Sequence, residues 1–140
     1  MSYFIHESSY VDDGVKIGEE CSIGQNVNIT DNVIMGNEMK VKNNVSAYED
    51  AESEDCVFLG LCCVFTNGLT LRVMYLKGRE NCKRTIIREE ASTGDNATIV
   101  CGHTIGRYAI VAAGEVVTND VSDFDRVVGV SQKLLAKKMN

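Results

Sequence analysis

A six-residue period runs through almost the whole chain and limits the folds that it can adopt. Starting at Ile5 and stepping six residues at a time to Phe65, then resuming at Ile87 and continuing to Val117, fifteen of the seventeen positions are apolar. An amphipathic helix repeats near 3.6 residues and cannot keep a period of six over so many units. A flat β-sandwich would place turn signals every 8–12 residues. The period therefore predicts a solenoid of short strands and tight corners.

Two further positions of each repeat support this interpretation. The residue four places after each period position is again apolar or small, as at Val27, Val45 and Ala97, and glycine recurs directly after the period position itself, as at Gly18 and Gly94. Three six-residue units make a triangular coil of eighteen, in which residues eighteen apart stack at the interstrand spacing of about 4.8 Å. We expect one domain over 1–140, with repeats over 5–70 and 87–122.

Composition and charge exclude several classes of function. The net charge of −6 argues against a nucleic-acid surface, which needs a basic face. No run of about 18 apolar residues is present to insert into a membrane, and the first ten residues lack the pattern of a signal peptide. The six cysteines contain no C-x-x-C pair, and no group of His, Cys and Asp has metal-ligand spacing. We therefore expect a metal-free cytoplasmic protein with reduced, mostly structural thiols.

A basic stretch interrupts the period over 71–86. Its cations are opposed by Glu80 alone, and they are Arg72, Lys77, Arg79, Lys83 and Arg84, followed at once by Arg88. A local charge near +5 in a chain of −6 indicates either a solvated excursion loop or a binding site for phosphate groups. Long insertions into compact domains are uncommon and often functional, which favours binding.

The chain after Val121 departs from the repeat. Ser131 is a candidate N-cap for a short helix over about 131–139, which would cover the apolar side chains and open strand edges of the last coil.

Specific segments resemble a known family of enzymes. The run over 41–49, the segment Val64-Phe-Thr-Asn67, the run over 96–102 and the motif Val111-Ala-Ala-Gly114 look like the hexapeptide-repeat nucleotide-sugar N-acetyltransferases, which make 3-acetamido sugars for bacterial surface polysaccharides such as lipopolysaccharide. The basic stretch that follows Asn67 is similar to that family's basic loop. The resemblance implies an all-β left-handed parallel β-helix. It also implies acetyl-CoA as acyl donor, a UDP- or dTDP-linked amino sugar as acceptor, and a homotrimer with sites between subunits.

The resemblance and the stacking together give candidate site residues. Asp31, Glu49 and Asn67 are eighteen apart and predict an outward ladder that leads into the basic loop. Glu49 would hold or deprotonate the amine, and Asn67 would orient the acceptor or donate to an oxygen. The remaining substrate-binding candidates are Asp31, Arg72, Tyr75, Lys77 and Arg79, and the cofactor-binding candidates are Asn96, Ala113, Thr118 and Lys133. The alternative for the ladder is a set of turn residues and solvated carboxylates.

Two alternatives to N-acetyl transfer remain. His103 falls on an inward position, where a core or corner histidine is the simplest interpretation, but it is also a candidate base for an O-acetyltransferase. A β-helix without catalysis, acting as a scaffold or binding protein, would equally satisfy the repeat.

Overall fold

The structure is a computed structural model that describes residues 2–47, 50–66 and 84–129. Within them, short parallel strands form three sheets, which we name A, B and C. Sheet A contains β1 (Phe4–Ile5), β4 (Ser22–Ile23), β7 (Lys40–Val41), β10 (Phe58–Leu59), β13 (Ser92–Thr93), β16 (Ile110–Val111) and β18 (Arg126–Val127). Sheet B contains β2 (Tyr10–Val11), β5 (Asn28–Ile29), β8 (Ser46–Ala47), β11 (Val64–Phe65), β14 (Thr98–Ile99) and β17 (Val116–Val117). Sheet C contains β3 (Lys16–Ile17), β6 (Ile34–Met35), β9 (Ala51–Ser53), β12 (Thr85–Ile87) and β15 (Thr104–Ile105).

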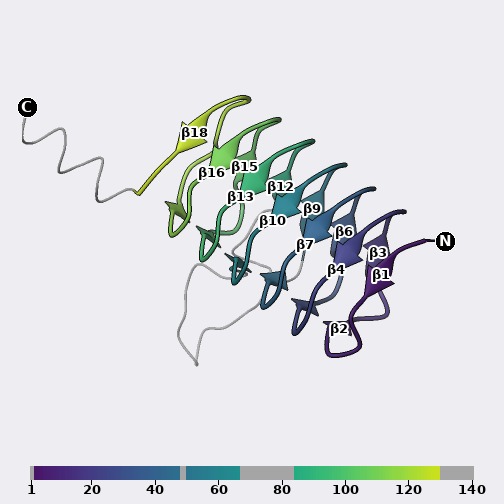
Figure 1. The fold of residues 1–140 in the computed structure, drawn as a ribbon. Helices are drawn as coiled ribbons and strands as arrows, with labels where there is room; N and C mark the ends of the chain where they lie inside the picture. The colour runs from purple at the N-terminus through teal and green to yellow at the C-terminus, as the bar shows by residue number, and fades with distance from the viewer. Residues whose placement is uncertain (1, 48–49, 67–83, 130–140) are drawn as a thin grey trace, which may run out of the picture.

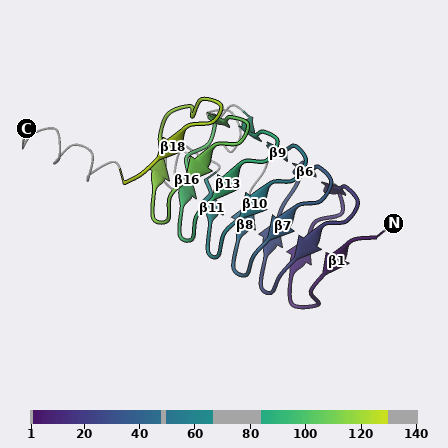
Figure 2. The same cartoon turned by 45° about the horizontal axis from the view of Figure 1, so that its top comes forward.

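The chain passes through sheets A, B and C in turn, and each circuit is one coil of a three-sided solenoid (Figure 1). The coils stack in chain order, so that β1 and β18 lie at opposite ends of the stack in both views (Figure 2). Strand pairs such as Phe4 with Ser22 confirm the eighteen-residue register. The predicted all-β solenoid is therefore confirmed, while its left-handedness remains an implication of the resemblance. The predicted helix over 131–139 lies outside the described residues.

The apolar period positions form the core. They are buried from Ile23 onward, and Ile23, Ile29, Ile87, Ile99 and Ile105 are each at most 1% exposed. The position two residues before each of them is also inward, and mostly small or β-branched residues fill it because the triangular interior is narrow, with Met39 and Glu115 among the exceptions. In the first coil the period positions are half-buried, because that coil has a neighbour on one side only.

Four buried polar side chains interrupt this core in the described residues, namely Ser53, Thr85, Thr93 and Glu115. Ser53 and Thr93 occupy period positions and are buried, and Thr93 Oγ1 lies 3.4 Å from Cys63 Sγ, to which it donates. Glu115 is 4% exposed in the last complete coil, and its Oε1 has no hydrogen-bond partner in the described part of the chain. A buried acceptor without a partner costs about 1–3 kcal/mol, so Glu115 lowers the stability of this coil.

The corners between sheets have a common backbone form. Most corners contain one residue with a positive φ, which is near 60° where that residue is not glycine, and these residues recur at intervals of six over most of the chain. Asn and Asp accept this region readily, but Tyr108 (φ 58°) and Phe124 (φ 66°) do so at a cost of about 1 kcal/mol each. Their rings stack on each other at 5.2 Å, which offsets part of that cost.

The interruption of the repeat closes slightly earlier than the sequence predicts. Strand β12 begins at Thr85, so residues 85 and 86 belong to the solenoid and not to the excursion predicted over 71–86. Ile87 pairs with Ser53, as the period requires. The register across this coil is 34 residues, against 18 in the coils that precede it, which confirms an insertion of sixteen.

The repeat also continues further than predicted. Val121 bridges to Ile105, and β18 pairs with β16 with Arg126 opposite Ile110. The step here is 16 residues, because the corner between Val117 and Val121 is two residues shorter than the others. The six-residue count therefore fails after Val117 although the coil itself is complete.

One of the predicted thiols is oxidised. Cys101 is disulfide-bonded, whereas Cys21, Cys56, Cys62 and Cys63 are free thiols. The prediction of six reduced cysteines is therefore wrong at Cys101. Cys63 fits the prediction of a structural thiol, since burial raises its pKa to about 11.

Candidate functional site

The corner between sheets B and C, which we call the excursion corner, differs from the other two in its residues and its length. Its described residues are 12–15, 30–33, 50, 66, 84, 100–103 and 118–120, and both the chain between Thr66 and Arg84 and the shortened turn after Val117 connect sheet B to sheet C. The corner between sheets C and A, which we call the acidic corner, includes the carboxylates Glu19, Glu20, Glu38, Glu54, Asp55, Glu89 and Glu90. The corner between sheets A and B is called the third corner.

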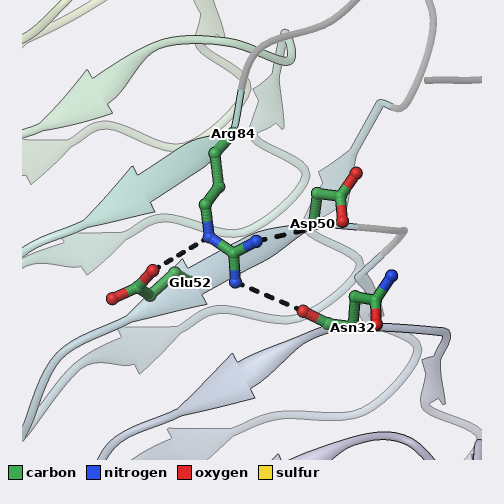
Figure 3. Close-up of polar contacts among 4 residues, drawn as sticks. All are labelled: Asn32, Asp50, Glu52 and Arg84. Atoms are coloured by element: carbon green, nitrogen blue, oxygen red, sulfur yellow. Dashed lines mark hydrogen bonds and ion pairs between the residues drawn. The ribbon is translucent and has the colours of Figure 1, made fainter. Parts of the chain in front are cut away.

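Arg84 connects three successive coils at the excursion corner (Figure 3). Its Nε donates to Glu52 Oε1 at 2.9 Å, and its Nη2 donates to the backbone carbonyl of Asn32 at 3.3 Å. Its Nη1 lies 3.9 Å from Asp50 Oδ1. Arg84 is placed for this because it directly precedes β12, whose Thr85 pairs with Ala51, so that Arg84 stacks above Asp50 and Asn32.

A pocket of about 240 Å³ opens beside this cluster. It is lined by Gly14, Lys16, Asn32, Ile34, Asp50 and Arg84. Gly14, Asn32, Asp50 and Arg84 lie at equivalent positions of successive coils on the excursion corner. Lys16 and Ile34 lie on the outer faces of β3 and β6. Positive and negative groups thus face the same small space.

A histidine and a carboxylate meet higher on the same corner. His103 Nδ1 lies 3.4 Å from Asp120 Oδ1, and the side chain of His103 is 27% exposed. Asp120 Oδ1 also accepts from the backbone N–H of Thr104 at 2.9 Å, which fixes the carboxylate. The sequence placed His103 on an inward position, and the structure makes it a half-buried corner residue with a carboxylate partner. The ring is therefore accessible and oriented, as a base requires.

The predicted ladder is described only in part. Asp31 is exposed on the excursion corner, and its backbone carbonyl accepts from Asp50 N at 3.4 Å. Glu49 and Asn67 lie outside the described residues, as do the substrate-binding candidates Arg72, Tyr75, Lys77 and Arg79. The described structure stops after Thr66 and resumes at Arg84, and both residues lie at this corner.

The predicted phosphate-binding charge is smaller than the sequence suggests. Arg84 is paired with Glu52, and Arg88 Nη1 lies 3.4 Å from Glu54 Oε2 at the acidic corner. These two arginines therefore have carboxylate partners outside the basic stretch, in the coil below, 32 and 34 residues away in sequence.

The predicted cofactor-binding residues divide between two corners. Asn96 and Ala113 are exposed on successive coils of the third corner, where Gly114 N donates to Asp95 O at 2.8 Å. Thr118 is exposed on the excursion corner, after β17. Sheet B separates the two corners, and Lys133 lies outside the described residues. The described candidates are thus not brought together at one point.

Sequence reasoning missed the residues that line the pocket. Stacking by eighteen places Asn32 under Asp50 in one column and Lys16 under Ile34 in another. This stacking could have been predicted from the sequence. The pairing of Arg84 with Glu52 depends on where the excursion closes, and the pairing of His103 with Asp120 depends on a turn that lacks two residues, so neither could have been predicted.

No cluster of three or more His, Cys, Asp or Glu side chains that would hold a metal ion occurs in residues 2–47, 50–66 and 84–129. The described part of the chain also has no helix long and apolar enough to cross a membrane. The expectation of a metal-free protein stays a prediction.

Comparison with characterised proteins gives matches in sequence. The chain is 48% identical over 50 residues to the dTDP-3-amino-3,6-dideoxy-alpha-D-galactopyranose 3-N-acetyltransferase of Aneurinibacillus thermoaerophilus, a match that covers 36% of this chain and 26% of that enzyme. It is 28% identical over 129 residues to the bifunctional protein GlmU of Caldicellulosiruptor saccharolyticus, with 85% of this chain and 26% of that protein covered. The chain thus spans about a quarter of the length of the curated relatives it matches. No family model matches it.

Solved structures match the fold. The perosamine N-acetyltransferase of Caulobacter crescentus, solved with CoA and GDP-perosamine, superposes with a TM-score of 0.79 at 24% identity, over 93% of this chain and 54% of that one. The acetyltransferase domain of PglB from Neisseria gonorrhoeae, solved with acetyl coenzyme A, superposes with a TM-score of 0.76 at 18% identity, over 91% of this chain and 54% of that one. Repeat, register and these matches show that the chain has a β-helix of hexapeptide repeats, the fold of these sugar N-acetyltransferase structures, and that part of it is similar in sequence to an amino-sugar 3-N-acetyltransferase.

Proposed function

We propose that this chain transfers an acetyl group from acetyl-CoA to the amino group of a nucleotide-linked amino-deoxy sugar. The observation that carries this proposal is the 48% identity over 50 residues with an enzyme named for that reaction. The β-helix supports it, because superposable structures hold CoA together with a nucleotide-linked amino sugar.

The reaction asks little of the protein. An amine attacks the thioester when it is neutral, close to the carbonyl carbon and accompanied by a donor for the developing oxyanion. A protein base speeds this step but is not obligatory. The excursion corner presents Asp31, Asp50, Arg84 and His103 on its surface. A corner with these groups suits an acceptor that carries an amine and phosphates.

The residues outside the described structure keep the roles proposed from the sequence. Asn67 would orient the acceptor or stabilise the oxyanion, and Glu49 would hold or deprotonate the amine. The excursion cations would contact the phosphates, and the acceptor site would lie between subunits of a homotrimer.

A second candidate is O-acetyl transfer with His103 as base. The specific observation in its favour is the 3.4 Å contact between His103 Nδ1 and Asp120 Oδ1. A carboxylate on Nδ1 holds the ring in the tautomer in which Nε2 accepts a proton, which is what activation of a hydroxyl requires.

A thiol-release assay with acetyl-CoA tests both candidates. The acceptors are UDP- and dTDP-linked 3-amino sugars and their 3-hydroxy counterparts. We expect thiol release with one or more amino sugars and none with the hydroxy sugars. Release with the hydroxy sugars alone would favour the second candidate. Thiol release at the background rate with every acceptor would contradict both candidates and favour a scaffold or binding protein.

Three variants then assign the roles. Asn67→Ala should lower turnover by roughly 10²–10³, the effect of removing one preorganised donor. Glu49→Gln should lower the rate at neutral pH and recover as pH rises, because the amine then deprotonates without help. His103→Ala should lower stability and leave the pH profile of amine acetylation unchanged. If His103→Ala abolishes turnover in a folded protein while Asn67→Ala stays active, the histidine is the base and the second candidate replaces the first.

A further inference from the structure

The pocket at the excursion corner has opposite charges on its lining. Asp50 contributes a carboxylate, Lys16 contributes an ammonium group, and Arg84 contributes a guanidinium whose Nε is already bonded to Glu52. With Arg84 neutralised by Glu52, the groups left to meet a ligand are one anion and one cation. A ligand that satisfies both must carry an ammonium group and an anionic group.

The Asp50 carboxylate faces Arg84 but accepts no hydrogen bond from it. Its Oδ1 lies 3.9 Å from Arg84 Nη1, which is beyond hydrogen-bond distance, and this is the one ion pair that Asp50 makes among the described residues. Its side chain is 27% exposed. Arg84, fixed by Glu52 and by the carbonyl of Asn32, therefore orients the Asp50 carboxylate while leaving its oxygens able to accept from a ligand.

The size of the pocket selects part of a ligand. Pockets for drug-sized molecules measure about 300–1,000 Å³. A volume of about 240 Å³ is smaller than this range and suits a sugar ring with its substituents better than a whole nucleotide sugar. The nucleotide would then lie outside the pocket.

We propose that this pocket is the subsite for the amino-sugar ring of the acceptor, in which Asp50 binds the amino group, Lys16 binds an adjoining phosphate and Arg84 positions Asp50. The assignment rests on the proposed function for the class of acceptor. Glu49 and Asn67 keep their proposed roles in the chemical step, because this subsite recognises the ring before the acetyl group is transferred.

Arg88 provides a matched control for Arg84. The two arginines flank β12 at its opposite ends, and each pairs with a glutamate of the coil below, Glu52 or Glu54. Their side chains are 35% and 38% exposed. Removing either one takes away a similar surface ion pair, but only Arg84 adjoins the pocket.

The test measures binding by calorimetry without acetyl-CoA, so that it does not depend on turnover. The probes are a dTDP-linked 3-amino sugar and the same sugar nucleotide with a 3-hydroxyl group. The wild-type protein should prefer the amino sugar by roughly tenfold, the value of one charge-assisted contact. Asp50→Asn should abolish this preference, and Arg84→Met should reduce it. Arg88→Met should keep it. Lys16→Met should weaken both sugars equally, because both carry the phosphates.

The outcomes separate this inference from the proposed function. An undiminished preference in Asp50→Asn, or equal losses in Arg84→Met and Arg88→Met, would overturn the subsite even if acetyl transfer is observed. Absence of a preference in the wild-type protein would also overturn it. A preference that Asp50→Asn removes, together with no thiol release from acetyl-CoA, would overturn the proposed reaction and leave the subsite in place.

Discussion

At the acidic corner, side-chain oxygens of one coil bind the backbone of the coil below it. Asn37 Oδ1 accepts from Glu19 N and Asp55 Oδ1 accepts from Asn37 N, both at 2.8 Å, and Glu38 N donates to Glu19 O at 2.8 Å. At the excursion corner the corresponding backbone contact, from Asp50 N to Asp31 O, is 3.4 Å long. Side-chain oxygens such as Asp120 Oδ1 accept backbone N–H groups here too, but Arg84 in addition binds side chains and a carbonyl group of two other coils. The same repeat thus makes one corner mainly structural and leaves the polar groups of the other available to a ligand.

The largest expected difference between the two corners concerns their glycines. A Cβ added at Gly36, on the acidic corner, would lie 2.5 Å from the carbonyl carbon of Glu54, whereas a Cβ at Gly14, on the excursion corner, would meet nothing within 4 Å. Backbone cannot yield as a flexible side chain does. Gly36→Ala should therefore destabilise the protein by about 2–3 kcal/mol, and Gly14→Ala should change stability by less than about 0.5 kcal/mol.

Urea unfolding followed by circular dichroism measures both variants. Equal midpoints for Gly36→Ala and the wild-type protein would show that the acidic corner can open to admit a methyl group. The distinction between a closely packed and an open corner would then be wrong.

A smaller difference should separate the aspartates of the two corners. Asp55→Ala removes the acceptor of Asn37 N and should cost about 1 kcal/mol, the net value of one hydrogen bond. Asp55→Asn keeps a carbonyl oxygen in the same place and should recover most of the loss. Asp31→Ala is the control at the excursion corner and should be neutral within about 0.5 kcal/mol, because Asp31 is exposed. A loss in Asp31→Ala as large as that in Asp55→Ala would contradict the comparison.

These contrasts show what a repetitive sequence reveals and what it leaves hidden. The period gave the three-sheet solenoid, the buried positions and the restart at Ile87, since each depends only on residues eighteen apart. It also placed Asp31 on the corner from which the excursion leaves. It could not place Arg84 beside Glu52, because that contact spans 32 residues and requires the excursion to close before Thr85.

The last coil shows the same limit. Six residues beyond Val117 the sequence has no apolar residue to continue the period. For this reason β18 and the contact of His103 with Asp120 were not predicted. Local chemistry also overrode residue preference: Tyr108 and Phe124 adopt a positive φ that aromatic residues rarely take, because coil stacking fixes the corner.

The smallest expected difference concerns thiol chemistry. Cys56 lies on the acidic corner, where partial burial, and then the Sγ–H bond to Glu38 Oε1 at 3.5 Å, raise its pKa. A raised pKa leaves less thiolate at pH 8, so alkylation by iodoacetamide should be slow. Glu38→Gln should speed it by about two- to fivefold, since one charge at 4 Å in water is worth about 1 kcal/mol.

Peptide mapping by mass spectrometry after timed alkylation measures this rate residue by residue. Cys101 on the excursion corner is disulfide-bonded and should label only after reduction. Identical rates at Cys56 in the wild-type protein and in Glu38→Gln would remove the electrostatic influence assigned to the acidic corner.

The two departures from an eighteen-residue coil, the insertion of sixteen and the loss of two, both fall on the excursion corner. Each strand that follows nevertheless starts in register with the coil below, because pairing begins anew at every strand and does not depend on the length of chain that precedes it. This corner therefore acts as the place where such a chain can gain or lose segments without disturbing its core. New recognition loops can be acquired here by insertion, and their substrate preference can diverge while the prism that carries them stays the same.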